Sequence, residues 1–295
     1  MRKLLITGGS GLIGGSLLQH LSGKYQVYAT YMHNPITWTS CVPVKLSLGN
    51  LQQIKRLISE VNPDVIIHTA AVTDLDECER NKDRAVKVNV KAVREIAQAS
   101  VNINSRLIFF STDMVFSGDK GWYSEDDIPD PINFYGVTKA EAEGEVMKFC
   151  KDYIILRSAL VYGKRRFKFQ AKISFSDWIV DSIIRSEEIP IFMDQYRTPI
   201  GLSNLCRAVE ELLHIEFTGV LHVAGAERVD RYTFARELLN MLNLPIDHLN
   251  PIKMENFQAD AKRPRDLSFD ITLARDIFTI EFLGCREGLR EEYLK

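Results

Sequence analysis

The sequence lacks the cysteine pattern of a disulfide framework or of a zinc site. Its five cysteines are odd in number, lie far apart along the 295 residues and form no CxxC pair. Lysine plus arginine (37) nearly balance aspartate plus glutamate (39), so the chain has no excess charge for a polyanion. No apolar run approaches the roughly 20 residues of a membrane span. These absences predict a cytoplasmic protein without a metal, a membrane or a nucleic acid as partner.

What is present is an alternation of short apolar runs with longer segments of helical periodicity. Several of the runs are apolar on both faces, which is typical of parallel strands covered by helices. We therefore predict an α/β fold with a Rossmann-type doubly wound parallel sheet. The expected strands of the first half are 3–7, 26–30, 64–68, 106–111 and 153–157, and the expected helices are 12–22, 50–61, 83–100 and 136–150.

The regular alternation loosens after about residue 158. We interpret residues 1–157 as an NAD(P)-binding Rossmann domain and residues 158–295 as a smaller C-terminal substrate-binding lobe. The boundary is soft, and we expect some segments of the second half to return to the first domain. The expected helices of the second half are 174–187, 203–215 and 231–242, and its expected strands are 189–192 and 220–225.

A glycine-rich stretch, LLITGGSGLIGG (residues 4–15), follows the first expected strand and opens the first expected helix. Its glycines provide what a pyrophosphate site requires: a tight turn, close approach of the backbone to the ligand, and contact between helix and sheet. The helix N-terminus adds free N–H groups and a partial positive charge. A flexible turn is the alternative interpretation. We predict a dinucleotide-binding loop that contains Gly8, Gly11, Leu12, Ile13 and Gly14.

The end of the second expected strand, VYATYMHNP (residues 27–35), carries neither an acid nor an arginine. An acid at this place bonds the ribose 2′-hydroxyl of NAD and repels the 2′-phosphate of NADP. Thr30 and His33 are the obvious polar candidates here. We therefore predict that NADP(H) is the favoured cofactor, with NAD(H) as the alternative, and that Thr30 contacts it.

The stretch NFYGVTKAEAEGE (residues 133–145) places a tyrosine and a lysine on one face of a helix. Tyr135 and Lys139 are four residues apart, which is about one helical turn. A phenol titrates near pH ~10 in water, and a nearby ammonium favours phenolate and lowers its pKa by roughly 1 to 3 units. The pair therefore predicts a tuned general acid. The alternative is a half-buried tyrosine beside a solvated lysine.

Polar residues follow two of the expected strands. IFFSTDMVFSG (108–118) ends one strand with Ser111, Thr112 and Asp113, and PDVIIHTAAVTDLDECE (63–79) ends another. The carboxyl ends of parallel strands share one edge, where open α/β sheets bind ligands. We therefore expect the glycine loop, a strand-end hydroxyl and the tyrosine–lysine pair to surround one crevice.

That combination resembles the Ser/Thr, Tyr and Lys site of the extended short-chain dehydrogenase/reductases. Within this superfamily, the chain is most similar to the dTDP-4-dehydrorhamnose reductase family. The resemblance covers nearly the full length. It rests on four stretches: HTAAVTDLDECE (68–79), STDMVFSGDKGWYSEDDIPDPINFYGVTKAEAE (111–143), MDQYRTP (193–199) and AKRPRDLSFD (261–270).

The resemblance implies that a reduced nicotinamide gives hydride to the C4 ketone of a nucleotide-linked 6-deoxy-4-ketohexose. It also implies that Tyr135 protonates the developing alkoxide, Lys139 holds the nicotinamide ribose and tunes the phenol, and Thr112 hydrogen-bonds the carbonyl oxygen. A nucleotide sugar is then the expected partner, and assembly into a homodimer is left open. The further residues implied are Ala70, Ala71 and Thr73 for the cofactor, and Thr73, Asp113 and Arg263 for the substrate.

Three positions depart from the residues that this family often has near the sugar and its neighbouring loop: Met114, Leu160 and Ile200. They leave the identity of the ketosugar open. One alternative function is that of a sugar-nucleotide epimerase or dehydratase of the same superfamily. Another is that of a non-catalytic, NADP-binding subunit like the regulatory partner of methionine adenosyltransferase.

Individual residues also have simpler interpretations. Asp113 could instead cap the turn that follows its strand, and Arg263 could be a solvated loop residue. The basic run GKRRFKFQAK (163–172) is either a loop over the substrate diphosphate or a solvated loop.

Overall fold

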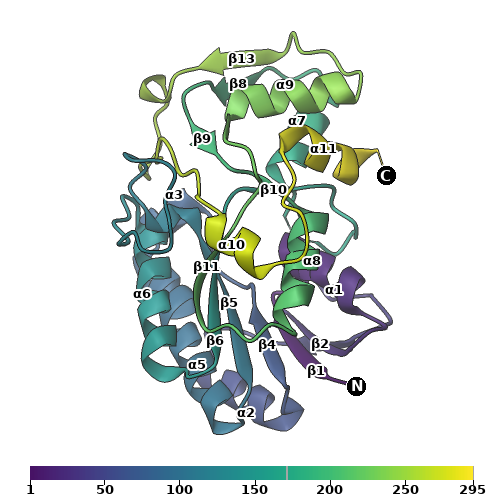
Figure 1. Cartoon of the computed structure of the whole chain (residues 1–295), viewed down its shortest axis with the longest axis vertical. Helices are drawn as coiled ribbons and strands as arrows, with labels where there is room; N and C mark the ends of the chain where they lie inside the picture. Colours follow the sequence, from purple (N-terminus) through teal and green to yellow (C-terminus); the bar gives the residue numbers. More distant parts are fainter. Residues whose placement is uncertain (171, 295) are drawn as a thin grey trace.

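The computed structural model describes residues 1–170 and 172–294, so residue 171 of the basic run lies outside the described part. Its centre is a seven-stranded parallel sheet in the order β11-β6-β5-β4-β1-β2-β3 (Figure 1). This order confirms the predicted Rossmann-type doubly wound sheet. The strands are β1 (Lys3–Thr7), β2 (Gln26–Tyr31), β3 (Val42–Lys45), β4 (Val65–His68), β5 (Arg106–Thr112), β6 (Tyr153–Ser158) and β11 (Gly219–Val223).

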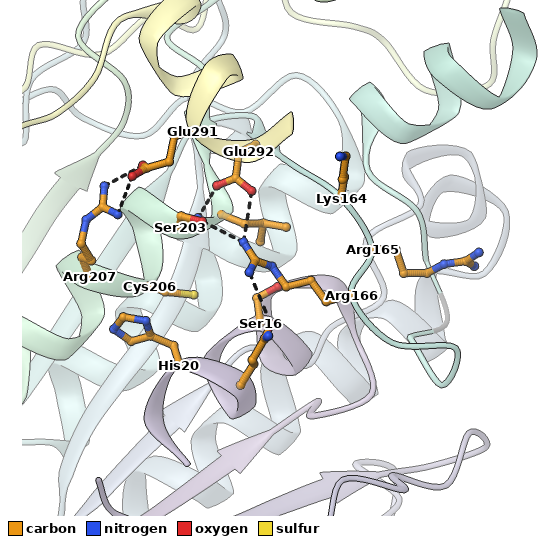
Figure 2. Close-up of a pocket in the computed structure, with 12 residues that line it drawn as sticks. Ser16, His20, Lys164, Arg165, Arg166, Ser203, Cys206, Arg207, Glu291 and Glu292 are labelled. Carbon is orange, nitrogen blue, oxygen red and sulfur yellow. Dashed lines mark hydrogen bonds and ion pairs between the residues drawn. The ribbon is translucent and has the colours of Figure 1, made fainter. Parts of the chain in front are cut away.

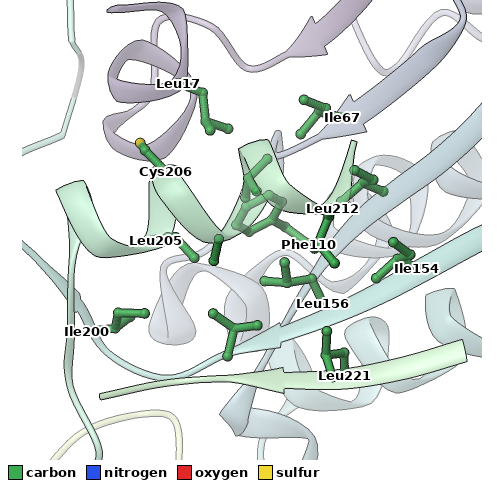
Figure 3. Close-up of a cluster of buried hydrophobic side chains, with 14 of the residues drawn as sticks. Leu17, Ile67, Phe110, Ile154, Leu156, Ile200, Leu205, Cys206, Leu212 and Leu221 are labelled. Carbon is green, nitrogen blue, oxygen red and sulfur yellow. The ribbon is translucent and has the colours of Figure 1, made fainter. Parts of the chain in front are cut away.

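Helices cover both faces of the sheet, because successive side chains of each buried strand point to opposite sides. Leu5 and Phe109 belong to the core on one face. Phe110 belongs to the core on the other face, where Leu17 of α1 and Leu205 of α8 lie above the strands (Figure 3). The helices of the first core are α2 (Leu51–Val61), α5 (Ala92–Asn102) and α6 (Phe134–Phe149), and those of the second are α1 (Leu12–Leu21), α8 (Leu202–Leu212) and α10 (Thr272–Ile277).

The second half of the chain builds a separate small core beyond the carboxyl edge of the sheet and also returns to the sheet itself. The helix α8 packs in the same core as α1, and β11 is the edge strand beside β6. The chain therefore passes between the sheet and the lobe more than once (Figure 1). The elements of the lobe core are α7 (Phe175–Ile184), β8 (Ile189–Phe192), α9 (Arg231–Met241), β13 (Leu249–Ile252) and α11 (Cys285–Tyr293).

Nearly all the expected strands and helices are confirmed, with ends that shift by up to three residues. The strands β3 and β13 and the helices α3 (Leu75–Arg80), α10 and α11 were not expected. The strand β3 contains Pro43 and is largely exposed, so its pattern is weak. The expected helix 83–100 is divided by a π-helical turn, η1 (Lys87–Lys91), between α4 (Lys82–Val86) and α5. The remaining short elements are η2 (Asp113–Val115), β7 (Val161–Tyr162), β9 (Tyr196–Arg197), β10 (Ile200–Gly201), β12 (Val229–Asp230) and η3 (Met254–Asn256).

Among residues 1–170 and 172–294, no helix combines the length and the apolar character needed to cross a membrane.

Candidate active site

The glycine loop joins β1 to α1, and three of the four residues at 8–11 are glycines without a side chain. Gly8 has a φ of +75°, a conformation that residues with a side chain rarely adopt. A Cβ at Gly14 would lie 2.2 Å from the carbonyl oxygen of Gly8, so the helix can start this close to the loop only with glycine there. The Gly8 N–H donates to Thr30 Oγ1 over 3.2 Å and fixes the turn. The loop is therefore a backbone cradle that a pyrophosphate can approach closely.

The first turn of α1 offers hydrogen-bond donors to an anion. Within the described part of the chain, the N–H groups of Leu12, Ile13 and Gly14 make no backbone hydrogen bond. Such free donors, together with the helix dipole, favour phosphate oxygens at this end of a helix. The residues predicted for the dinucleotide loop thus fit the pyrophosphate of NADP or NAD.

Thr30 supports this loop from behind. Its side chain is buried, and its hydroxyl oxygen accepts the hydrogen bond from Gly8. The Thr30 hydroxyl is therefore hydrogen-bonded within the protein, to the Gly8 N–H. A direct contact of Thr30 with the cofactor stays a prediction.

A lysine of β3, Lys45, lies beside the end of β2, where the sequence pattern did not reveal a cation. His33, Lys45 and Ser47 line a cavity of about 240 Å³ there. Lys45 ends β3 and lies opposite Tyr31 of β2, and its ammonium forms no ion pair with any described residue. Lys45 was missed because β3 was not expected, so its place beside the end of β2 could not be inferred. An ammonium at this edge suits the 2′-phosphate of NADP.

The segment after β4 forms the other wall of the glycine loop. Ala70 lies so close that a Cβ at Gly8 would be 3.0 Å from the Ala70 Cβ. Ala71 follows and is partly exposed. The Thr73 hydroxyl accepts a hydrogen bond from Lys172 Nζ, in the second half of the chain, over 2.6 Å. Ala70 therefore lies beside the loop, and contacts of Ala71 and Thr73 with the cofactor stay predictions.

Asn89 fixes this segment, although the sequence analysis did not single it out. Only 1% of it is exposed, and it lies in the π-helical turn. Its Oδ1 accepts from the Val72 N–H (2.9 Å), and its Nδ2 donates to the Val72 carbonyl oxygen (3.0 Å) and to Thr138 Oγ1 (3.1 Å). Asn89 thus ties the wall of the crevice to α6, next to Lys139. A lone asparagine in an apolar helix pattern is a weak signal that could have indicated it.

Two features of α6 bring Tyr135 to the end of β5. The Asn133 side chain caps the helix by accepting the Gly136 N–H (2.9 Å). A Cβ at Gly136 would lie 2.1 Å from the Met114 carbonyl oxygen, so only glycine allows the helix to start this close to the end of β5. Tyr135 then enters a small apolar cluster that includes Val72, and only 8% of it is exposed.

The electrostatics of Tyr135 differ from the expectation. Burial raises the pKa of Tyr135 above its usual value of 10, while the neighbouring Thr112 hydroxyl lowers it and the Asp113 charge raises it. Lys139 is not among the groups that shift this pKa, and its Nζ donates to the Phe110 carbonyl oxygen over 2.5 Å. The prediction that the lysine lowers the pKa of the phenol is therefore wrong for this arrangement.

Lys139 is a buried cation one turn along α6 from Tyr135. Its ammonium lies 4.0 Å from the ring centre of Phe109. Burial lowers the pKa of Lys139 to about 7, and the charge of Glu143 raises it. The lysine consequently exchanges its proton near neutral pH.

A buried ion pair holds the next turn of α6 against the sheet. Arg157 of β6 donates to Glu143 over 2.7 Å, and both side chains are at most 3% exposed. The Ser111 hydroxyl also donates to Glu143. Ser111 therefore supports the helix, and Thr112 is the strand-end hydroxyl beside the phenol.

Asp113 and Arg263 are each held by a partner on another element. Asp113 Oδ2 lies 3.2 Å from Arg197 Nε, and Thr112, not Asp113, caps the following turn by accepting the Met114 N–H. Arg263 donates to Asp76 over 2.7 Å and is thus an ion-paired residue. Direct contact of either residue with a substrate stays a prediction.

The basic run packs against the first turn of α1. Gln170 is buried, its Nε2 donates to the Leu12 carbonyl oxygen (3.0 Å), and its Oε1 accepts from the N–H of Phe167 (2.9 Å). The Phe167 ring lies 4.9 Å from that of Trp38. This part of the run is therefore a packed loop beside the glycine cradle.

A cavity larger than the one at the end of β2 lies elsewhere. It measures about 800 Å³ and opens between α1, the start of the basic run, α8 and α11 (Figure 2). Four charged side chains on its walls form ion pairs, Arg207 with Glu291 and Arg166 with Glu292 (Figure 2). None of the predicted catalytic residues lines it. We therefore place the candidate active site at the edge of the sheet where Thr112 neighbours Tyr135, with Lys139 one turn along α6; β1 enters the glycine loop at the same edge of the parallel sheet.

Similar proteins are known over nearly the full length of the chain. The family model described as "RmlD substrate binding domain" matches residues 1–294. The probable low-salt glycan biosynthesis reductase Agl14 of Haloferax volcanii is 28% identical over 290 residues, which is 98% of this chain and 95% of that protein. Methionine adenosyltransferase 2 subunit beta of Bos taurus is 28% identical over 300 residues, which is 98% of this chain and 86% of that protein. The crystal structure of dTDP-4-dehydrorhamnose reductase from Bacillus anthracis in complex with NADP superposes on this chain with a TM-score of 0.89 at 28% identity. The superposition covers 100% of this chain and 99% of that one.

Proposed function

Because the chain belongs to the RmlD substrate binding domain family, we propose that it is an oxidoreductase that uses NADPH to reduce a nucleotide-activated 4-ketosugar. The observation that carries this proposal is the convergence of Thr112, Tyr135 and Lys139, all buried, at the sheet edge that holds the glycine loop. The leading substrate is a nucleotide-linked 6-deoxy-4-ketohexose such as dTDP-4-dehydrorhamnose, and the proposed setting is dTDP-rhamnose formation in the cytoplasm.

NADP(H) is the favoured cofactor, with NAD(H) as the alternative. A similar solved protein binds NADP, and Lys45 supplies a cation at the end of β2 in this chain. The backbone cradle at Gly8 and the free N–H groups of the first turn of α1 would hold the pyrophosphate of either dinucleotide.

The bound dinucleotide would supply the hydride, and the side chains would manage the oxygen that gains charge. Tyr135 would donate its proton to that oxygen, and its raised pKa keeps the phenol protonated at neutral pH. The Thr112 hydroxyl, which now donates to Asp113 over 3.0 Å, would turn to the same oxygen. Lys139 keeps N–H donors beyond the one given to Phe110, and these would hold the cofactor ribose.

The decisive experiment measures NADPH oxidation by the purified protein against dTDP- and UDP-linked 4-keto-6-deoxyhexoses. Turnover with one of these sugars, and its loss in the Tyr135→Phe variant, is the expected result. NADPH binding without oxidation in the presence of every ketosugar would contradict the proposal. Tightly retained NAD without consumption of added NADPH would instead indicate an epimerase or a dehydratase.

A second candidate function is that of a non-catalytic subunit. It is favoured by the similarity to methionine adenosyltransferase 2 subunit beta over 98% of the chain, and by Met114 and Leu160 at positions that the resemblance places near the sugar. Size-exclusion chromatography with a purified methionine adenosyltransferase catalytic subunit tests it. A stoichiometric complex, together with no reduction of any ketosugar, would support this function, and separate elution would exclude it.

A further inference from the structure

Two guanidinium groups lie close to one carboxylate at the lobe side of the crevice. Arg197 and Asp113 form an ion pair, and they are 1% and 5% exposed. Burial raises the pKa of Asp113, whereas the charges of Arg197 and of Arg231, the first residue of α9, lower it. Burial and the charge of Arg197 in turn lower the pKa of Arg231. One carboxylate thus faces two cations.

Arg231 is held in a fixed position. Its Nε donates to Gln195 Oε1 (3.1 Å), and its backbone N–H donates to the Gln195 carbonyl oxygen (3.1 Å). The guanidinium carbon lies 4.5 Å from the ring centre of Phe175. Because two contacts orient the guanidinium and a third fixes its backbone, little side-chain entropy remains to be lost when a ligand binds.

The outer end of this guanidinium has no partner in the protein. Within residues 1–170 and 172–294, the two terminal nitrogens of Arg231 form no hydrogen bond and no ion pair, and they are not sealed from solvent. Asp113, the nearby carboxylate, is already paired with Arg197, and the planar fork of an arginine matches an oxyanion with two parallel hydrogen bonds.

We infer that Arg231 binds an oxyanion of the substrate beside the Asp113–Arg197 pair. The inference deepens the proposed function and rests on it, since Asp113 directly follows Thr112, the hydroxyl proposed for the reacting oxygen. Arg263, the guanidinium that the sequence pointed to for a phosphate, is already bonded to Asp76. The oxyanion is either the diphosphate that links sugar and nucleoside or a carboxylate on the sugar.

The test compares Arg231→Met, which keeps an apolar stem, with Arg231→Lys, which keeps the charge but loses the fork. Arg236→Met is the matched control, because Arg236 lies on the same helix, is exposed and has no ion pair among the described residues. Isothermal titration at saturating NADP⁺ measures binding of four probes: dTDP, UDP, UDP-glucose and UDP-glucuronate. NADPH affinity and the unfolding temperature of each variant are measured in parallel.

If the diphosphate is the oxyanion, Arg231→Met lowers the binding affinity for dTDP or UDP and for both UDP-sugars by about 10- to 100-fold, as expected for the loss of charge-assisted hydrogen bonds. Arg231→Lys lowers these affinities less, because it keeps the charge. If a sugar carboxylate is the oxyanion, only UDP-glucuronate binding weakens. Equal binding of all probes by wild type and Arg231→Met overturns the inference while leaving the reductase proposal intact. Failure of the NADPH-binding wild type to bind any probe overturns both.

Discussion

Replacing Asn89 by alanine should reduce stability and catalysis together. The substitution removes three hydrogen bonds of 2.9, 3.0 and 3.1 Å from a residue that is 1% exposed. The buried N–H and carbonyl groups of Val72 then lose their side-chain partner. Each unsatisfied group lowers the free energy of unfolding by roughly 1 to 3 kcal/mol. Thr138 loses less, because its hydroxyl still donates to the Tyr135 carbonyl oxygen. We expect the free energy of unfolding to fall by about 2 to 4 kcal/mol.

Asn204 provides a matched control for this change. It is 2% exposed, its Nδ2 donates to the Glu281 carbonyl oxygen (2.9 Å), and its Oδ1 accepts from the Leu283 N–H (3.2 Å). This asparagine clamps a backbone segment in the same way but lies on α8, outside the crevice. Asn204→Ala should therefore lower stability by a similar amount, roughly 1 to 3 kcal/mol.

Urea unfolding, NADPH titration and steady-state kinetics on the two variants separate the roles. Asn89→Ala should lower kcat/KM by at least about 10-fold, because the wall after β4 and the helix that carries Tyr135 are no longer tied together, and small misplacements are costly in catalysis. Asn204→Ala should leave kcat and KM unchanged. Equal kinetics of the two variants at equal stability would refute the positioning role of Asn89.

Three further predictions concern the proton donor, the cofactor edge and the buried lysine. Tyr135→Phe should leave NADPH affinity nearly unchanged and lower turnover by about 10² to 10⁴-fold; wild-type turnover would speak against a general acid at this position. Lys45→Glu should weaken NADPH binding far more than NADH binding, since an acid repels the 2′-phosphate; a parallel change in both dissociation constants would exclude the contact. Lys139 has a pKa of about 7 in the folded state, below the ordinary 10.5. Between these two pH values the unfolded chain binds more protons than the folded chain, so the contribution of this group to the free energy of unfolding rises with pH. Lys139→Met should remove the rise between pH 7.5 and 9.5 in urea unfolding, and an unchanged pH slope would show that another group causes it.

The sequence predicted features that depend on neighbouring residues and on strand order. The glycine spacing placed Gly8 and Gly14 in a loop that leaves room for no Cβ, and the four-residue spacing placed Tyr135 and Lys139 on one helix. The parallel order of the strands then brought Thr112 to the same edge. These inferences need only the period of a helix and the direction of the strands.

What the sequence could not predict depends on partners from distant elements. The Lys139 ammonium is directed to the Phe110 carbonyl, and the Thr30 hydroxyl accepts from the Gly8 N–H, and the local sequence indicated neither of these partners. The ion pair of Arg263 comes from Asp76, 187 positions away. No local pattern contains such a pairing.

The return of α8 and β11 to the sheet also sets an order of events while the chain is being synthesised. When a ribosome has released only the first 160 residues, β6 is an open strand edge, and the apolar surface beside α1 has not yet received Leu205 and Leu212. Exposed edges and uncovered apolar faces invite aggregation and chaperone binding. Nascent chains of this protein should therefore depend on such protection until about residue 223 has emerged, and an isolated N-terminal fragment should keep that dependence permanently.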